Sequence, residues 1–278
     1  MEETFIIRLR KACRLAYTCQ EMSRWFVICI LFFMLTANSK STDQSTLATG
    51  VAEFRAGYEN WDANRFHKAS ELIKQATQNA PDFAANFYWL GVVEFHRMLY
   101  YQNASGGQTN RLAIKVSRDT AMTALNRAVK LDPRHAESHA LLATLYGMQI
   151  ENNLARAIWY GPKVQKHGKL ALDYAPESPR VQYLIGACKF HTAKKPDAFR
   201  EALATLLKAE ELFNGEAKNA PGPLEPRWGY AGCLVLIGQT FEQLDQKQKA
   251  AEYFLKAVAV QPSNVLAKQG LERVTKNK

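Results

Sequence analysis

The chain has 278 residues, of which 47% are hydrophobic and 22% are charged, and its formal net charge is +10. This composition is that of a folded protein with room for one sizeable domain, and it excludes a disordered polymer. A basic surplus without long runs of one sign suits anionic partners such as headgroups or acidic polymers, although it more often indicates only a solvated surface.

The first predicted element lies in "MSRWFVICILFFMLTANSK", residues 22–40. Residues 25–35 are eleven consecutive apolar residues, preceded by Arg24 and followed by the small-x-small pattern Ala37-Asn38-Ser39. A positive charge, a short apolar run and small residues at a cleavage position together predict a secretory signal. Eleven residues are too few to cross a hydrocarbon core of about 30 Å. An uncleaved signal anchor is the alternative, and it is the only membrane contact that we expect.

Residues 1–39 are therefore interpreted as an N-terminal segment with a secretory signal, and residues 40–49 as a short linker. Residues 1–21 are polar and include three glutamates, which is unusual for the start of a signal, so translation from Met22 is one hypothesis. The predicted location is the periplasm or cell envelope. Of the five cysteines, Cys188 and Cys233 lie beyond the signal among apolar residues, and we expect buried thiols rather than a disulfide framework.

After the linker, the sequence pattern repeats with a period of 34 residues. It is clearest in "AGCLVLIGQTFEQLDQKQKAAEYFLKAVAVQPSN", residues 231–264. Three- and four-residue spacings mark two helical faces, and a proline ends the second helix. The residues that carry this pattern are Leu234, Ile237, Gly238, Phe241, Ala250, Phe254, Ala257 and Pro262. The small residues Gly238, Ala250 and Ala257 in this pattern predict that the two helices run antiparallel and in close contact.

This window resembles the tetratricopeptide repeat (TPR) family, which has Leu-Gly, an aromatic residue, three small residues and a proline at fixed positions. "RAVKLDP" at 127–133 and "KAVAVQP" at 256–262 match the same part of the repeat. "YGPK" and "WGY" are in addition similar to stretches of small exported bacterial proteins of this family. The resemblance covers about residues 50–278. It implies an all-α, right-handed α-solenoid of about five TPR-like helix pairs with a C-terminal capping helix. The expected repeats are 50–83, 84–135, 136–178, 179–226 and 231–264, and the cap is 265–278.

Three of these repeats are longer than the template, and each excess falls between the two helices of its repeat. Gly91 and Ala121, for example, are 30 positions apart where the template has 12. We expect the insertions to gather on one edge of the solenoid as a recognition surface. Its candidate residues are Tyr100, Tyr101, Trp159, Tyr160 and Lys163, and the alternative is that Trp159 and Tyr160 only pin the insertion to the helices. A further insertion, "NGEAKNAPGPLEPRW", lies between repeats and is predicted to be an ordered loop or linker.

The resemblance also implies a ligand-binding concave face, at fixed positions of the first helix of each repeat. Carried onto this chain, these positions predict an aromatic, mildly basic groove. The corresponding candidates are Phe54, Tyr58, Trp61, Tyr88, Phe95, His96, Arg180, Tyr183, Phe190 and His191. Some of these side chains are alternatively expected to pack between repeats.

The sequence offers no motif for catalysis: no phosphate loop, nucleophile elbow or paired-cysteine metal site is present. "HAESH", residues 135–139, has two histidines four residues apart but lacks the His-Glu-x-x-His pattern, so surface histidines are the preferred interpretation. We therefore predict no enzyme activity, no metal and no cofactor.

The function that the sequence predicts is a non-enzymatic scaffold that binds a protein or peptide partner in the cell envelope, without nucleic acid. The alternative is a ligand-binding component associated with an envelope transporter. An enclosed pocket beneath the insertions favours the transporter component, whereas an open groove favours the scaffold.

Overall fold

A computed structural model describes residues 45–103, 110–150 and 153–276, and within these residues every regular element is a helix. The predicted secretory signal lies outside the described residues. Helical residues 45–60 are followed by α2 (Ala63–Asn79), α3 (Ala84–Asn103), α4 (Arg111–Leu131), α5 (Ala136–Met148), α6 (Leu154–Tyr174), α7 (Pro179–Thr192), α8 (Pro196–Glu216), α9 (Tyr230–Gln243), α10 (Lys247–Val260) and α11 (Val265–Thr275). In the part of the chain so described, no helix is both long and apolar enough to span a bilayer.

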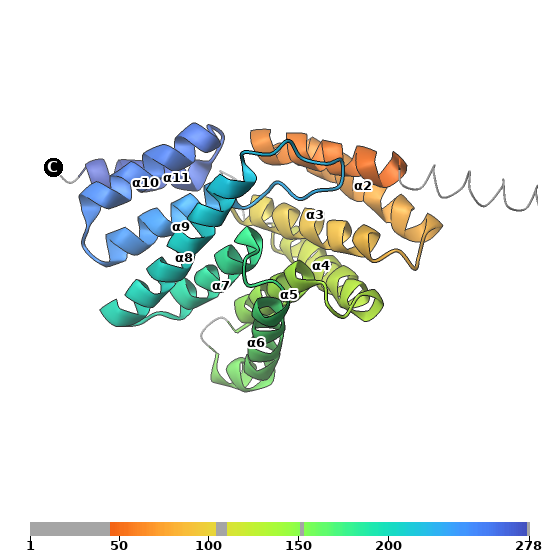
Figure 1. The fold of residues 1–278 in the computed structure, drawn as a ribbon, viewed down its shortest axis with the longest axis horizontal. Coiled ribbons are helices and arrows are strands. Elements are labelled where there is room, and N and C mark those ends of the chain that lie inside the picture. Colours follow the sequence, from red (N-terminus) through yellow and green to blue (C-terminus); the bar gives the residue numbers. More distant parts are fainter. Residues whose placement is uncertain (1–44, 104–109, 151–152, 277–278) are drawn as a thin grey trace, which may run out of the picture. The chain divides into compact units, whose positions relative to one another are not determined.

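The helices form antiparallel pairs that stack side by side (Figure 1). α3 packs on α4, α5 on α6, α7 on α8 and α9 on α10, while α11 covers the last pair. This arrangement confirms the prediction of an all-α repeat solenoid with a terminal helix. Stacking is required because a single helix pair cannot shield its apolar face from water, whereas successive pairs bury it against each other.

Small residues of the repeat pattern allow the two helices of a pair to approach closely. A Cβ atom added at Gly91 in α3 would lie 2.5 Å from Cγ of Leu125 in α4. Another at Gly238 in α9 would lie 2.8 Å from Cε1 of Phe254 in α10. Both distances are below van der Waals contact, so the close packing of these pairs depends on glycine.

The expected linker over residues 40–49 is wrong for residues 45–49, which are helical and place Leu47 in the core. The sequence pattern underestimated this helix because the repeat template begins only at residue 50. The helix ends at Trp61, whose φ of 52° breaks the helical path. Asp62 then caps α2, since its carboxylate accepts hydrogen bonds from the backbone N–H groups of Asn64 (2.8 Å) and Arg65 (3.3 Å).

The insertions lengthen helices more than they form loops. α3 has 20 residues and α4, α6 and α8 have 21 each. The prediction placed the excess residues in the turns between helices, and it is wrong for the parts that continue α3 and begin α4 and α6. The reason is that "HRMLYYQN" contains no glycine or proline and includes the good helix formers Arg, Met, Leu and Gln, so it extends the element. α6 gains little packing from its length, because Ala171 is its single buried residue.

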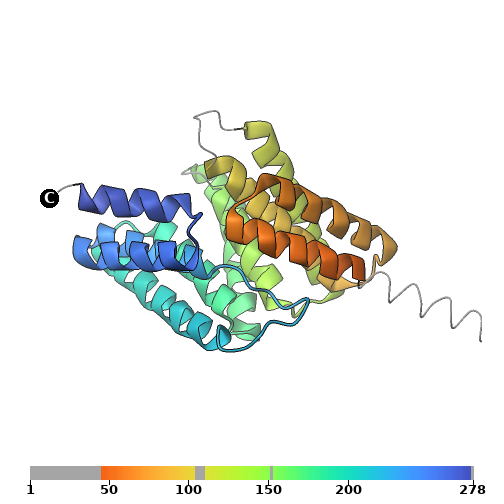
Figure 2. The same ribbon diagram turned by 90° about the horizontal axis from the view of Figure 1, so that it is seen from above.

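The solenoid curls until its two ends meet at the turn between α10 and α11 (Figure 2). The Gln261 amide donates a hydrogen bond to the backbone oxygen of Tyr58. The Ser263 hydroxyl donates to the backbone oxygen of Glu59 over 2.7 Å. These ends do not share a core, because helix 45–60 belongs to one hydrophobic cluster and α10 to another. The described residues from Thr46 onward therefore form a curled solenoid rather than a single bundle.

Candidate functional site

Residues 217–229 form an irregular strap that joins α8 to α9 and crosses to the first helix of the solenoid (Figure 1). The Arg55 guanidinium donates to the carbonyl oxygens of Gly222 (2.7 Å) and Glu225 (2.5 Å). The backbone N–H of Gly229 donates to the Tyr58 hydroxyl over 3.0 Å. The strap thus ties helix 45–60 to the fourth and fifth helix pairs.

Gly229 is the residue at which the strap turns into α9. Its φ of 103° lies in the left-handed region, and a Cβ there would meet the Phe213 ring at 3.1 Å and the Tyr183 ring at 3.3 Å. Glycine is therefore required at this turn for both conformation and space.

Trp228 inserts from the strap into the face that the first helices of the repeats share. Its side chain is 2% exposed. The indole N–H donates to the Tyr88 hydroxyl over 3.3 Å, and the His96 ring lies 5.2 Å from the indole in an edge-to-face arrangement. Burial lowers the pKa of His96 to about 4, so this histidine is neutral at pH 7. The chain's own tryptophan thus occupies the middle of the predicted groove.

A network of charges centred on the buried Arg180 lies beside Trp228. Nε of Arg180 is 2.8 Å from Glu137, and its two terminal nitrogens lie 3.0 and 2.5 Å from the Glu216 carboxylate. Burial alone would lower the pKa of Arg180, but the two carboxylates outweigh it and hold that pKa above its usual value. The Tyr88 hydroxyl donates to Glu137, and burial together with this carboxylate raises the pKa of Tyr88. Arg227 of the strap closes the network by donating to the backbone oxygen of Glu216 over 2.5 Å.

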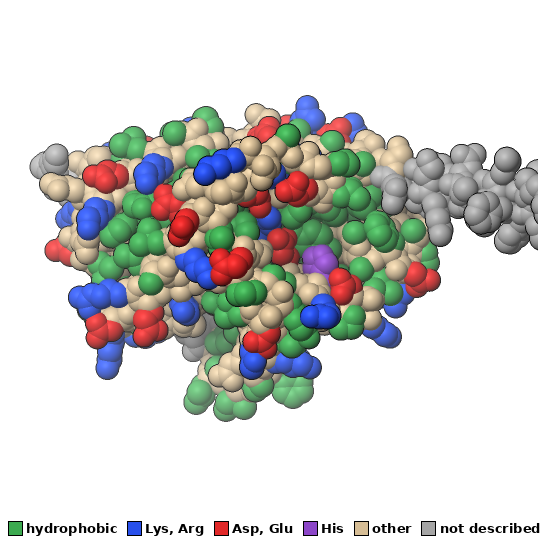
Figure 3. Space-filling model, in the orientation of Figure 1, with side chains coloured by type: hydrophobic (Ala, Val, Ile, Leu, Met, Phe, Trp, Pro, Cys, Tyr) green, Lys and Arg blue, Asp and Glu red, His purple; other side chains and the backbone are tan. Residues whose placement is uncertain are grey.

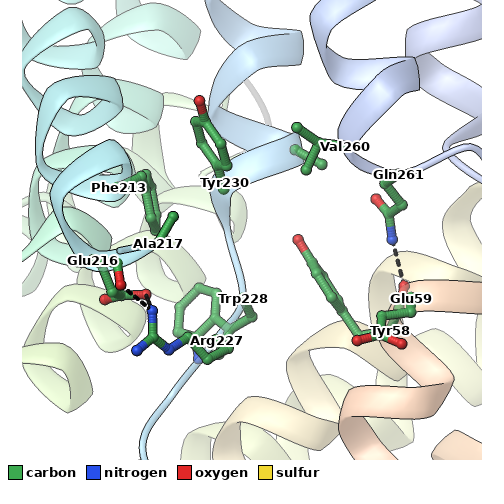
Figure 4. Close-up of a pocket in the computed structure, with 11 residues that line it drawn as sticks. Tyr58, Glu59, Phe213, Glu216, Ala217, Arg227, Trp228, Tyr230, Val260 and Gln261 are labelled. Atoms are coloured by element: carbon green, nitrogen blue, oxygen red, sulfur yellow. Dashed lines mark hydrogen bonds and ion pairs between the residues drawn. The ribbon is translucent and has the colours of Figure 1, made fainter. Parts of the chain in front are cut away.

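A pocket of about 240 Å³ opens next to the strap (Figure 4). Its wall is mostly aromatic and apolar, and three separate parts of the chain meet in it: helix 45–60, the α8–strap–α9 segment and the end of α10. The lining residues are Tyr58, Glu59, Phe213, Glu216, Ala217, Arg227, Trp228, Tyr230, Ala231, Val260 and Gln261. In Figure 4 the Tyr58 hydroxyl points toward the space between Tyr230 and Val260. Desolvation raises the pKa of Tyr58 to about 12, so the phenol stays protonated and offers a hydrogen bond.

The predicted concave-face residues are brought together, but half of them are not accessible. Phe54, Tyr88, Phe95, His96 and Arg180 are all buried. The prediction that these five line an exposed groove is wrong, because the strap and the neighbouring helices cover them. Tyr58 is half-buried and is the one predicted groove residue that lines the pocket.

The remaining predicted groove residues are dispersed. Trp61 is half-buried and packs edge-to-face on Phe66, with ring centroids 5.6 Å apart. Tyr183 lies beneath Gly229, and Phe190 packs on Phe199 at 5.7 Å. His191 is exposed near the end of α7 and does not line the pocket.

The predicted insertion surface divides into packed and exposed residues. Tyr100 packs on Trp61, with centroids 6.1 Å apart, and Tyr160 stacks on a tyrosine of α5 at 6.0 Å. Tyr101 is half-buried and lies beneath an arginine of α3. Trp159 alone is largely exposed, and the Lys163 ammonium lies 5.2 Å from the centre of its ring. The interpretation of Tyr160 as a packing residue agrees with its stacking, whereas Trp159 is free of such packing.

Sequence reasoning missed the contribution of the strap. Its "PRWG" segment was identified only as part of a loop, yet it supplies Arg227, Trp228 and Gly229 to the site. The signal present was a tryptophan next to a glycine in an otherwise polar stretch, since a large aromatic residue there is more often packed than solvated. Among the described residues, no group of histidine, cysteine and carboxylate side chains is arranged to hold a metal ion.

Comparison with known proteins supports the fold. The sequence model of the family described as regulator of microtubule dynamics protein 1-3 matches residues 97–276. No curated protein sequence matches the chain. A thermophilic TPR protein from Thermus thermophilus is similar in structure, with a TM-score of 0.59, 15% identity, and coverage of 84% of this chain and 98% of that one. A chain of the APC/C hetero-tetramer Cut9–Hcn1 gives a TM-score of 0.55 and 13% identity, over 82% of this chain and 36% of its own length.

Proposed function

The chain belongs to the regulator of microtubule dynamics protein 1-3 family, and from this premise we propose that it is a protein-interaction scaffold whose partner acts in regulating microtubule dynamics. The observation that carries the proposal is the pocket beside the strap. A stacked-helix scaffold holds its walls rigidly, which limits the entropy lost when a partner binds.

The pocket suits a short apolar or aromatic anchor of a partner protein. Phe213, Trp228, Tyr230 and Val260 supply the apolar wall. The protonated hydroxyl of Tyr58 supplies a hydrogen-bond donor. A volume of about 240 Å³ is below the range of a drug-sized ligand site, about 300–1,000 Å³, and matches one or two side chains of a peptide.

The position of the pocket favours a scaffold over a transporter-associated ligand carrier. The pocket lies beside the strap, α8, α9 and α10, rather than beneath the insertions of the second and third repeats. An enclosed cavity beneath those insertions was the expectation for a ligand carrier. Export to the cell envelope stays a prediction of residues 22–39, and fractionation of cells producing the full chain tests it.

A photo-crosslinking experiment tests the proposal at residue resolution. Benzoylphenylalanine replaces Val260, which lines the pocket and is 48% exposed, or Leu255, which is on the same helix, is 54% exposed and does not line the pocket. We expect position 260 to capture a discrete protein in extracts of the source cells, and position 255 not to capture it. The same crosslinked species at both positions would exclude the pocket as the binding site.

A second measurement tests the microtubule part separately. The full chain is added to dynamic microtubules in extract, and growth and shortening rates are recorded for the wild type, Val260→Asp and Leu255→Asp. We expect the wild type and Leu255→Asp to change these rates and Val260→Asp to have no effect. Unchanged rates with wild type would contradict the proposed process while leaving the crosslinking result to stand on its own.

A further inference from the structure

The N-terminal half of α6 carries an apolar surface that the fold leaves uncovered. Leu154, Ile158 and Trp159 are 76%, 72% and 68% exposed. Ile158 lies four residues after Leu154, and Trp159 comes directly after Ile158, so all three lie within the first two turns of the helix. Burying such side chains in an apolar medium is favourable at roughly 25 cal/mol per Å², so three neighbouring exposed ones indicate an interaction surface rather than scattered surface residues.

The shape of this surface argues against a groove-type protein site. α6 projects from the molecule at the bottom of Figure 1, and in Figure 3 hydrophobic side chains gather at the lowest end of that projection, with Lys and Arg side chains nearby. α6 packs mainly on α5 and makes few contacts with α7, and Ala171, its only buried residue, lies near its C-terminal end. A projecting apolar tip fits a deformable medium into which it can insert.

The positive charge of α6 indicates an anionic partner for this surface. Lys163, Lys166 and Lys169 are the lysines of α6, and Asp173 is its single anion. Asp173 lies 2.5 Å from the Lys169 ammonium, so the other cations lie on the side nearer the apolar tip. The Lys163 ammonium is held 5.2 Å from the Trp159 ring centre. An indole beside ammonium groups is the composition of a helix that lies at an anionic membrane interface.

We propose that the N-terminal half of α6 docks the protein onto an anionic lipid bilayer, with Leu154, Ile158 and Trp159 inserted among the acyl chains and the α6 cations at the headgroups. The basic character of the whole chain, +10, favours approach to the same surface. This docking surface is separate from the strap pocket, so its failure leaves the proposed scaffold function untouched.

Vesicle flotation with the full chain tests the proposal. The wild type is compared with Ile158→Glu/Trp159→Glu and with the control Leu112→Glu/Val116→Glu, which changes two exposed apolar residues of α4. Residues 25–35 are present in every variant, so their own membrane affinity cancels in the comparison. On phosphatidylcholine vesicles containing phosphatidylserine, we expect the α6 variant to lose about tenfold or more of the partition coefficient and the α4 control to match the wild type.

Three results would overturn the proposal. They are equal binding by the α6 variant and the wild type, an equal loss in the α4 control, and equal binding to vesicles that lack phosphatidylserine. Sedimentation velocity covers the case of a second copy as the occupant: if the α6 variant changes self-association and no variant binds vesicles, the surface is a dimer interface instead.

A fluorescence measurement isolates α6 from the rest of the chain. Phospholipids brominated on their acyl chains quench tryptophans that enter the hydrocarbon region. We expect Trp159→Phe to remove a quenched component that the wild type shows with phosphatidylserine-containing vesicles. An identical quenched fraction in both proteins would show that Trp159 does not insert.

Discussion

Replacing Trp228 with alanine tests whether the strap is part of the folded core or lies loosely on it. The side chain is 2% exposed and belongs to the same hydrophobic cluster as Trp89 and Phe54. Removing a fully buried tryptophan costs about 3–5 kcal/mol, because transfer free energy is lost and a cavity remains. The indole hydrogen bond of 3.3 Å is long, so it contributes at the low end of the usual range, about 0.5 kcal/mol.

For a domain of this size, each kcal/mol shifts the melting temperature by about 2–4 °C. We therefore expect Trp228→Ala to lower the melting temperature by about 6–20 °C, measured by circular dichroism at 222 nm or by calorimetry. Trp228→Phe retains most of the ring contact and is expected to lie between Ala and wild type. Trp159→Ala is the matched control, since it removes an exposed tryptophan. If Trp228→Ala and Trp159→Ala melt at the same temperature, the strap is not an element of the core and the account of the filled groove is wrong.

The remaining predictions concern packing, charge and pH. Gly91→Ala is expected to lower the free energy of unfolding by about 1–3 kcal/mol through overpacking. Gly147→Ala, whose Cβ would meet nothing within 4 Å, is expected to be neutral or slightly stabilising. Urea titration measures both effects. Arg180→Met removes the cation between the half-buried carboxylates of Glu137 and Glu216, although Arg227 stays 3.6 Å from Glu216. The loss of these charged hydrogen bonds is expected to cost about 1.5–3 kcal/mol in the same titration. The pKa of His96 is lowered to about 4, so the unfolded chain binds the extra proton as pH falls below about 6.5 and stability declines between pH 6.5 and 4. His96→Gln should flatten the decline of melting temperature with falling pH, and a decline as steep as that of the wild type would contradict this role of His96.

The helical-repeat fold is readable from this sequence because it is encoded locally and repeatedly. Pairs such as Gly238 with Phe254, or Gly91 with Leu125, occupy equivalent positions of different repeats, and each pair specifies the approach of two neighbouring helices. Because the same pattern occurs in several repeats, each copy supports the fold assignment of the others. A single helical pattern has no such support.

The candidate site is not readable in the same way, because it depends on contacts between distant parts of the chain. The bond from Gly229 to Tyr58 and the bond from Gln261 to the same residue exist only because the solenoid curls and the strap returns to its first helix. The resemblance to the TPR family implies a shared face for Tyr88 and His96, and Trp228 contacts both residues. The repeat template contains no information on what covers that face. The strap lies between repeats, where the template makes no prediction.

The exposed residues of α6 show a second limit of sequence-based prediction, which concerns burial. The residue type of Trp159 makes it a candidate for recognition, but residue type alone does not decide between exposure and packing. The choice between exposure and packing depends on whether the next repeat covers the helix. Ala171 is the only buried residue of α6. The length of the insertion does not predict this low degree of burial.

The chain's own strap closes the face that the repeats share, and amide hydrogen exchange of Gly229 measures this closure. This N–H donates to the Tyr58 hydroxyl, so we expect strong protection in the wild type and at least a roughly tenfold faster exchange in Tyr58→Phe, with the protection of α3 and α4 unchanged. Exchange of the Gly229 amide at the rate of an unstructured peptide in the wild type would show that the strap does not close this face.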